Sequence, residues 1–333
     1  MILVTGATGM LGSRLIYDLV LKGYKVRAMR RTDSQLNRVN RYFSAHPELF
    51  NSVEWVNGDI TDIFSLEDAL AGVDTVYHCA ARVSFLPSEN ASMQLSNING
   101  TANVVNLCLE KGIRKLCYVS SIAALGRSGL ANMINEDSAW KTSKYNSAYA
   151  ISKYGGEREV WRGIAEGLDA VIVNPGVIIG AGDWKTDSSM LFRQVKKGLM
   201  FYTHGENGFV DVRDVSRIMI QLTESDIVNE RFILVSENKT FRGVFDRIAD
   251  RIGVRRASIY AGPLITSLAW RFEYLKYKLT GSKPVITRET ARSARGKNTY
   301  DNSKIKKLLG VEFIDINTSI DDASAEFLKN QIY

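Results

Sequence analysis

The 333-residue sequence predicts an α/β fold, in which helices cover both faces of a parallel sheet and a smaller α/β lobe follows. The first half alternates short apolar, β-branched runs with longer amphipathic segments, which is typical of βαβ units. A glycine-rich turn at residues 6–12 directly follows the first apolar run. Hydrophobic residues make up 45% of the chain and charged residues 24%, which excludes a disordered chain and indicates a large core.

Six apolar runs in the first half are expected to be strands, and the amphipathic segments between them are expected to be helices. Gly23, Gly72 and Gly112 follow three of these helices, and glycine is common where a helix ends. The expected strands are residues 2–5, 25–29, 53–56, 75–79, 115–120 and 170–174, and the expected helices are residues 10–21, 65–71, 91–111 and 149–166.

The alternation becomes less regular after Pro175, where glycines interrupt the sequence more often. We expect two domains, residues 1–175 with the sheet and residues 176–333 as a smaller lobe, with parts of 205–240 returning to the first domain. The lobe would cover the carboxyl ends of the strands, where open α/β sheets bind ligands. Within the lobe, the expected elements are helices over 188–197, 241–252 and 261–279 and a strand over 227–236.

The charge and cysteine content narrow the classes of partner. Lys and Arg number 43 against 36 Asp and Glu, a net charge of +7, but no run of five or six like charges indicates a nucleic-acid partner. The three cysteines and three histidines are too scattered for a disulfide framework or a metal site. We therefore expect no metal, and neutral thiols in a reducing compartment.

The sequence shows no targeting or membrane-spanning segment. Met1 leads directly into the first apolar run, and the apolar stretch 261–270 is too short to cross a bilayer. We expect a cytoplasmic protein with no membrane partner, and a homodimer is an open possibility.

The residues TGATGMLG, from Thr5 to Gly12, lie between the first expected strand and helix and form a phosphate-binding turn. Gly6 would allow the sharp turn, Gly9 the close approach of a pyrophosphate, and Gly12 the close packing of helix against strand. The first N–H groups of the helix and its positive dipole end would then face the phosphates.

This GxxGxxG spacing resembles the extended branch of the short-chain dehydrogenase/reductase superfamily, which has a Rossmann-type doubly wound parallel sheet. Three further segments resemble the family, namely GDITD at 58–62, HCAA at 78–81 and NINGT at 97–101, and the resemblance covers residues 1 to about 220. The segments VRAMRR and FVDVRDV look most like dihydroflavonol 4-reductase and 3β-hydroxysteroid dehydrogenase relatives. An NAD(P)-dependent enzyme is implied.

Tyr149 and Lys153 form a YxxxK pair on an expected helix, where residues four apart share one face. A phenol titrates near pH 10, so an adjacent ammonium, helped by the positive ring of an oxidised nicotinamide, should lower its pKa and make it a usable acid–base group. The resemblance adds Ser121 as the hydroxyl that holds the reacting oxygen and Asn97 as the family's helix asparagine, with Ser120 and Asn99 as their alternatives.

The same resemblance implies the residues that contact the cofactor. They are Thr5, Gly6, Thr8, Gly9, Met10, Leu11, Gly12, Arg30, Arg31, Asp59, Ile60, Ala80, Ala81, Asn97, Lys153, Asn174, Pro175 and Gly176. NAD-selective members carry an acid at the end of the second strand, where this sequence has Arg30. A guanidinium there would attract the 2′-phosphate, so NADP(H) is favoured over NAD, which remains possible.

Two departures from sugar-nucleotide members favour a reductase. The stretch after the sixth expected strand reads NPGVIIG, and Asn207 and Gly208 stand where those members tend to have an arginine that grips the diphosphate. We therefore expect NADP(H)-dependent reduction or oxidation of a carbonyl or alcohol on a partly apolar small molecule. The substrate would contact Ser84, Phe85, Ser121, Tyr149 and Arg213.

Two alternatives remain open. An NAD(P)-dependent nucleotide-sugar epimerase or dehydratase would use Arg213 on the diphosphate. A non-enzymatic, cofactor-sensing protein of the same fold is disfavoured because Ser121, Tyr149 and Lys153 are all present.

Overall fold

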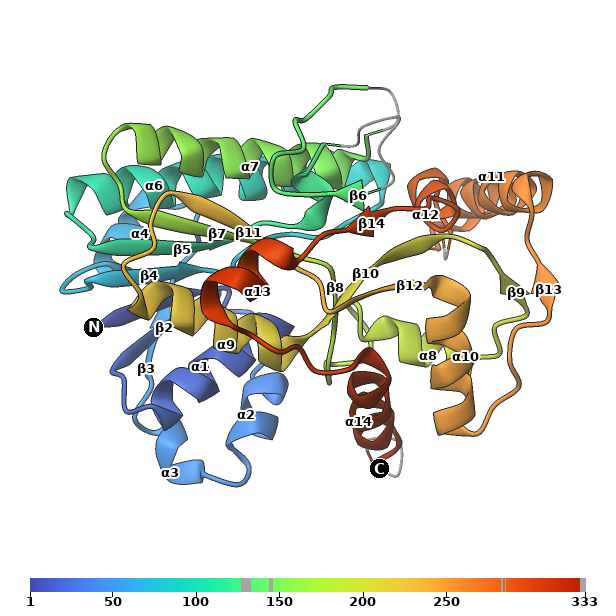
Figure 1. The fold of residues 1–333 in the computed structure, drawn as a ribbon, viewed down its shortest axis with the longest axis horizontal. Coiled ribbons are helices and arrows are strands. Elements are labelled where there is room, and N and C mark those ends of the chain that lie inside the picture. The colour runs from blue at the N-terminus through green and yellow to red at the C-terminus, as the bar shows by residue number, and fades with distance from the viewer. Residues whose placement is uncertain (127–132, 144–145, 283, 285, 330–333) are drawn as a thin grey trace.

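The computed structural model describes residues 1–126, 133–143, 146–282, 284 and 286–329. Its centre is a seven-stranded parallel sheet in the order β11-β7-β5-β4-β1-β2-β3 (Figure 1). The predicted parallel α/β fold is therefore confirmed. The strands are β1 (Ile2–Thr5), β2 (Val26–Arg30), β3 (Glu54–Asn57), β4 (Thr75–His78), β5 (Lys115–Val119), β7 (Ala170–Pro175) and β11 (Glu230–Leu234).

Helices cover both faces of this sheet (Figure 1). One face carries the helices α1 (Met10–Leu21) and α9 (Val212–Glu224). The helix α2 (Asn37–Phe43) packs beside α1, and α3 (Pro47–Phe50) packs beside α2. The other face carries α4 (Ile63–Ala69), α6 (Gly100–Glu110) and α7 (Ala148–Ala165). Because successive strand residues point to opposite faces, Val76 packs under α4 and α6 while Tyr77 packs under α1 and α9.

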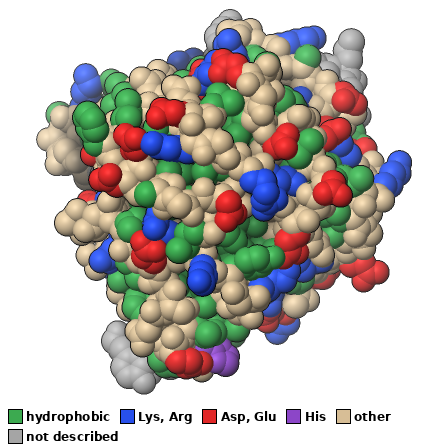
Figure 2. Space-filling view, turned by 90° about the vertical axis from the view of Figure 1, so that its left-hand side faces the viewer, with side chains coloured by type: hydrophobic (Ala, Val, Ile, Leu, Met, Phe, Trp, Pro, Cys, Tyr) green, Lys and Arg blue, Asp and Glu red, His purple; other side chains and the backbone are tan. Residues whose placement is uncertain are grey.

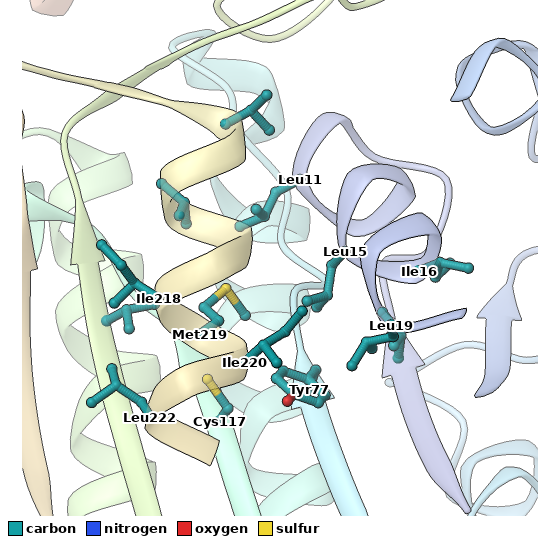
Figure 3. Close-up of a cluster of buried hydrophobic side chains, with 14 of the residues drawn as sticks. Leu11, Leu15, Ile16, Leu19, Tyr77, Cys117, Ile218, Met219, Ile220 and Leu222 are labelled. Atoms are coloured by element: carbon teal, nitrogen blue, oxygen red, sulfur yellow. The ribbon is translucent and has the colours of Figure 1, made fainter. Parts of the chain in front are cut away.

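The core under α1 and α9 is aliphatic and closely packed, as Figure 3 shows. Leu11, Leu15 and Leu19 of α1 recur at helical spacing and meet Met219 and Ile220 of α9 above the sheet. This packing fixes α1, and with it the phosphate turn, against the sheet.

The expected helix over 91–111 is wrong in one respect, because it is not a continuous α-helix. It consists of α5 (Asn90–Gln94), a π-helical turn η2 (Leu95–Asn99) and α6 (Gly100–Glu110). Single π turns inside helices occur frequently at functional sites. Here the turn contains Asn97.

The chain after residue 176 forms several helices and contributes to three small sheets, one of which also contains a strand from before residue 176. β8 (Val177–Ile179), β10 (Glu206–Asp211) and β12 (Glu237–Thr240) form one sheet, β9 (Phe201–Tyr202) pairs with β13 (Ile259–Tyr260), and β6 (Met133–Ile134) pairs with β14 (Thr299–Tyr300). The helices are α8 (Met190–Lys196), α10 (Phe241–Ile252), α11 (Pro263–Thr280), α12 (Arg288–Ser293), α13 (Ser303–Leu309) and α14 (Ile316–Lys329). In the part of the chain that the structure describes, no helix is long and apolar enough to cross a membrane.

Candidate active site

The phosphate turn lies where the strand order reverses, between β1 and β4. Gly6 has φ +67°, and a Cβ on it would lie 2.6 Å from the backbone nitrogen of Ala80, after β4. A Cβ on Gly12 would lie 2.2 Å from the carbonyl oxygen of Gly6. Both positions therefore require glycine to close the turn against its neighbours.

Gly9 differs from these two glycines, because a Cβ there would meet only the Gly6 carbonyl oxygen, at 3.2 Å. The space in front of Gly9 is open, as the approach of a pyrophosphate requires. Gly9 is also the N-cap of α1, and no side chain caps that helix. The N–H groups of Met10 and Leu11 thus lie in the first turn of a helix that can receive an anion.

An arginine that the sequence did not indicate holds the phosphate turn through a hydrogen bond to its backbone. Arg38, in α2, donates to the carbonyl oxygen of Thr8 at 3.2 Å and forms ion pairs with Asp183 and Asp187 at 2.9 and 2.8 Å. Arg38 therefore ties the loop that follows β8 to the phosphate turn. The contact joins residues far apart in the sequence, so no local pattern could have indicated it.

Arg30 and Arg31 lie at the end of β2, where the 2′-substituent of the adenosine ribose would be bound. The Arg30 guanidinium lies 5.6 Å from the ring centroid of Trp55 on β3, and its buried Nε has no hydrogen-bond partner. Arg31 is exposed and forms a 3.4 Å ion pair with Asp33. An arginine held against an aromatic ring in this position, with no acceptor at its buried Nε, suits a phosphate.

The segments after β3 and β4 lie at the same edge of the sheet as the phosphate turn. Asp59 accepts hydrogen bonds from the backbone and hydroxyl of Thr61, which fixes the turn after β3. Ile60 is buried and would contact any Cβ added at Gly100. Ala80 and Ala81 follow β4, and the Ala80 N–H donates to Thr5 Oγ1 at 3.3 Å.

A buried hydroxyl–imidazole–hydroxyl chain links β1, β4 and α6. Thr5 Oγ1 lies 2.7 Å from His78 Nδ1, and His78 Nε2 lies 3.1 Å from Thr101 Oγ1. Burial, together with the positive charge of Lys153, lowers the pKa of His78 to about 3. The ring is therefore neutral and structural, and Thr5 is engaged in this chain.

Asn97, in the π turn, holds the loop after β4. Its Oδ1 accepts from the Arg82 N–H at 2.7 Å, and its Nδ2 donates to the Arg82 carbonyl oxygen at 2.8 Å and to Ser152 Oγ at 3.0 Å. The Ser152 hydroxyl in turn donates to the carbonyl oxygen of Tyr149. Asn97 thus connects the loop that leads to Ser84 and Phe85 with the helix that carries Tyr149. Its neighbour Asn99 ends the same turn.

Tyr149 and Ser121 face each other at the carboxyl end of β5. Ser121 caps the short 3₁₀ helix η3 (Ile122–Ala124) by accepting from the Ala123 N–H at 3.1 Å, and its hydroxyl interacts with the Tyr149 phenol. Burial raises the pKa of Tyr149, and this hydrogen bond lowers it in part. Phe85 packs edge-on against Tyr149 with ring centroids 5.9 Å apart, whereas the Ser84 hydroxyl is buried and accepts from the Leu86 N–H.

Lys153 is buried but does not lower the pKa of Tyr149 as expected. Its ammonium donates to the Val119 carbonyl oxygen at 2.7 Å and to the Tyr118 hydroxyl at 3.3 Å. Burial lowers the pKa of Lys153 to about 8, although Glu157 opposes this shift. The expectation considered only the helix face, whereas the end of β5 provides acceptors that hold the ammonium.

Glu157 is a buried carboxylate that sequence analysis missed, one further turn along α7 from Lys153. It accepts from Ser120 Oγ at 2.5 Å, from Asn174 Nδ2 at 2.8 Å and from Arg231 Nη1 at 2.8 Å. Asn174 Nδ2 also donates to the Ser121 carbonyl oxygen at 3.0 Å. This set fixes the ends of β5 and β7, and it leaves Ser121 rather than Ser120 beside the phenol.

The predicted contacts at Asn174, Pro175 and Gly176 lie at the end of β7. Asn174 and Pro175 are buried, and the Asn174 side chain is used within the protein. A Cβ on Gly176 would lie 2.5 Å from the carbonyl oxygen of Gly208, so this glycine permits close packing against β10.

Arg213, at the start of α9, is held by two carboxylates. Its Nε and Nη2 donate to Asp211 at 2.9 and 2.7 Å, and Nη2 lies 2.9 Å from Asp322 Oδ2. A substrate diphosphate would have to replace these partners.

The described residues include no cluster of three or more His, Cys, Asp or Glu side chains that could hold a metal ion. Cys79, Cys108 and Cys117 are free, and burial raises the pKa of Cys108 and of Cys117 to about 12. These thiols are neutral. The site is therefore built from hydroxyls, a lysine and an open phosphate turn, and the uncrowded backbone at Gly9 suits the approach of a dinucleotide's pyrophosphate.

Known proteins share this sequence and fold. A dihydroflavonol 4-reductase-like protein of Synechocystis sp. is 29% identical over 332 residues, which cover 96% of this chain and 92% of that protein. A 3β-hydroxysteroid dehydrogenase/Δ5→4-isomerase of Mycobacterium tuberculosis is 29% identical over 205 residues, or 59% of this chain and 52% of that protein.

The fold also matches that of UDP-glucose 4-epimerase from Thermotoga maritima, solved with UDP-glucose. The TM-score is 0.78 at 20% identity, and the match covers 99% of each chain. At this identity the likeness shows the fold alone. Residues 2–234 match the model of the NAD dependent epimerase/dehydratase family. The chain thus belongs to this family, within the extended short-chain dehydrogenases/reductases, and is an NAD(P)-dependent enzyme.

Proposed function

We propose that this protein is an NADP(H)-dependent oxidoreductase that reduces a carbonyl, or oxidises the corresponding alcohol, on a partly apolar small molecule. The observation that carries the proposal is the pairing of the Ser121 hydroxyl with the Tyr149 phenol at the sheet edge that holds the phosphate turn. A carbonyl oxygen between these two groups would accept a hydrogen bond from each. A bound nicotinamide would supply or accept the hydride.

The roles of the chain's own residues follow from their contacts. Tyr149 would donate the proton to the reduced carbonyl oxygen, because its phenol is protonated near neutral pH and lies beside Ser121. Ser121 would orient that oxygen. Lys153 would hold the end of β5 and present its ammonium to the cofactor ribose, and Glu157 supports its charged form.

An apolar substrate is supported by the residues around the phenol. Phe85 packs on Tyr149, and Val83 in the same loop is 55% exposed. The reductase and steroid dehydrogenase relatives act, by name, on ring compounds, which agrees with an apolar pocket.

The NADP(H) preference rests on Arg30, whose guanidinium lies beside Trp55 and whose buried Nε has no hydrogen-bond partner. We expect NADPH to bind about tenfold or more tightly than NADH, since a charge-assisted contact to the 2′-phosphate is lost with NADH. Arg30→Asp should reverse this order, because the carboxylate repels the phosphate and accepts from the ribose hydroxyls. Fluorescence titration of both proteins with both cofactors measures it, and equal affinities in the wild type would refute the assignment.

The alternative, a nucleotide-sugar epimerase or dehydratase, agrees with the family and with the fold neighbour. It is weakened by Arg213, whose guanidinium is already engaged by Asp211 and Asp322. Calorimetry with UDP, GDP, dTDP and CDP in the presence of NADP⁺ discriminates the two functions. We expect no micromolar binding. Binding that is lost in Arg213→Ala would favour the nucleotide-sugar function instead.

A further inference from the structure

The helix α11 (Pro263–Thr280) exposes its apolar side chains to solvent instead of burying them. Leu264, Leu268, Phe272, Leu275 and Leu279 are 81%, 69%, 68%, 56% and 77% exposed. At about 100° per residue, these five positions fall within about 80° of the helix circumference. They form one continuous stripe, which we call the apolar stripe.

The opposite side of α11 faces the protein. Thr266 is buried there, and Trp270, Glu273 and Tyr277 on the same side are partly buried. The Tyr277 hydroxyl lies 3.4 Å from Ser88 Oγ, in the 3₁₀ helix η1 (Pro87–Glu89). The apolar stripe therefore points away from the body of the molecule, and none of the described elements covers it.

Basic residues border the apolar stripe on both sides. At helical spacing, Arg271 and Lys278 flank one edge and Lys276 flanks the other, and all three are exposed. The nearby acids are used within the protein, since Glu273 forms an ion pair with Lys276 and Glu289 accepts from the Ala148 N–H. Because Glu273 offsets the charge of Lys276, the positive border of the stripe is the edge with Arg271 and Lys278.

A cavity of about 570 Å³ lies beside the stripe, between α11 and α12. Four arginines line it together with Trp270, namely Arg271, Arg288, Arg292 and Arg295. Arg271 and Arg288 lie within 6.0 Å of the Trp270 ring. A basic, aromatic-walled cavity next to an apolar ridge matches the chemistry of an anionic lipid, whose headgroup is charged and whose chains are apolar.

The face of the molecule in Figure 2 differs from this region. There, basic and acidic side chains are interspersed and hydrophobic ones are scattered. A mixed surface of this kind suits contact with water, whereas a one-sided apolar stripe with basic borders suits an interface between water and lipid.

We infer that α11 docks on the surface of an anionic membrane, with the apolar stripe in the acyl region and the arginine-lined cavity at the headgroups. The helix lies in the interface and does not span it, because Arg271, Glu273, Lys276 and Lys278 interrupt its sequence. This revises the expectation that the protein has no membrane partner. The contact of Tyr277 with Ser88 places α11, on its protein-facing side, near the loop of Phe85, which packs on Tyr149.

The test is co-sedimentation of the full-length protein with vesicles of phosphatidylcholine alone or mixed with phosphatidylglycerol. We expect binding to the mixed vesicles at least about tenfold tighter than to neutral ones, weakened by salt. The double variant Leu268→Glu/Phe272→Glu should lose about tenfold or more of this binding, since two apolar side chains that would enter the lipid become charged. Arg271→Gln/Lys278→Gln should reduce the preference for phosphatidylglycerol.

Phe64→Glu is the matched control, because Phe64 is a similarly exposed phenylalanine, 79% exposed, on α4 and outside the apolar stripe. This substitution should leave vesicle binding unchanged. Circular dichroism of each variant establishes that it is folded. Wild-type protein that stays in the supernatant with mixed vesicles would overturn the inference. A second result would also overturn it: light scattering shows that the wild type is a dimer, Leu268→Glu/Phe272→Glu is a monomer, and neither protein binds vesicles. Neither result depends on turnover, so the proposed function is tested separately.

Discussion

At the scale of single residues, Tyr149 shows how the site differs from a simple YxxxK pair. The spacing places Tyr149 and Lys153 on one helix face, but the ammonium is held by Val119 and Tyr118 at the end of β5. Burial consequently dominates and raises the pKa of Tyr149. The phenol of the cofactor-free protein is therefore protonated at neutral pH, and burial makes it a weaker acid than an exposed tyrosine.

We predict that Tyr149→Phe keeps the fold and the affinity for NADPH but lowers kcat by about 10²–10⁴-fold or more. The substitution removes only the oxygen that would donate the proton. Steady-state rates on any carbonyl substrate found by screening, together with fluorescence titration of NADPH, measure both effects. Normal turnover by the variant would contradict the proposed mechanism.

Residues with local signatures could be predicted from the sequence, and those with distant partners could not. Tyr149 and Lys153 lie four positions apart, and the resemblance then indicated Ser121. Glu157 accepts a hydrogen bond from Arg231, which lies 74 positions away in the sequence. Arg38 forms ion pairs with Asp183 and Asp187, which follow it by more than 140 positions. A buried glutamate on a helix looks like any solvated one until the fold brings its partners together.

At the scale of elements, the phosphate turn could be predicted because each of its three glycines is required for a different physical reason. The predicted first helix, residues 10–21, matches α1 (Met10–Leu21). Helix α9 (Val212–Glu224) was missed, although Val215, Ile218, Met219 and Leu222 recur at helical spacing and are buried. The π turn at Asn97 was also missed, since no residue pattern distinguishes it from a continuous helix.

Two alanine substitutions in the turn should therefore have different consequences. Gly12→Ala places a Cβ 2.2 Å from the Gly6 carbonyl oxygen and should lower the melting temperature strongly or prevent folding. Gly9→Ala meets that oxygen at 3.2 Å, so the protein should fold with a cost of about 1 kcal/mol. The new methyl group would occupy the space that the pyrophosphate needs.

Thermal unfolding and NADPH titration separate these effects. Gly9→Ala should remain folded while its affinity for NADPH falls by about tenfold or more, the weakening expected when the backbone can no longer approach the phosphates. If Gly9→Ala binds NADPH like the wild type, the anion site is not at the start of α1.

At the scale of the whole molecule, alternation of strands and helices was enough to predict the large parallel sheet. All six expected strands are present, shifted by no more than a few residues. The small sheets were not predicted, because strands such as β9 and β13 are two residues long and pair across a wide sequence separation. Strands this short carry too little pattern to detect.

The chain from Thr5 through His78 to Thr101 couples the stability of the sheet to pH. The unfolded chain binds a proton at His78 near pH 6.5, whereas the folded protein, with a pKa of about 3, does not. The unfolded state therefore gains protons as the pH falls from 6.5 towards 3, and the free energy of unfolding decreases. Above pH 6.5 the group is neutral in both states and adds no pH dependence.

From these two pKa values, His78 alone should reduce the stability of the wild type by about 3 kcal/mol between pH 7 and pH 4.

His78→Gln keeps a donor and an acceptor towards Thr5 and Thr101 but cannot take up a proton. It should be less stable than the wild type at pH 7, with a difference that shrinks as the pH falls. Urea unfolding of the wild type and His78→Gln at several pH values measures this difference, in which the contributions of carboxylates that both proteins share cancel. Parallel curves for wild type and His78→Gln would show that His78 takes up its proton equally in both states, and that burial between β1, β4 and α6 does not keep the ring neutral.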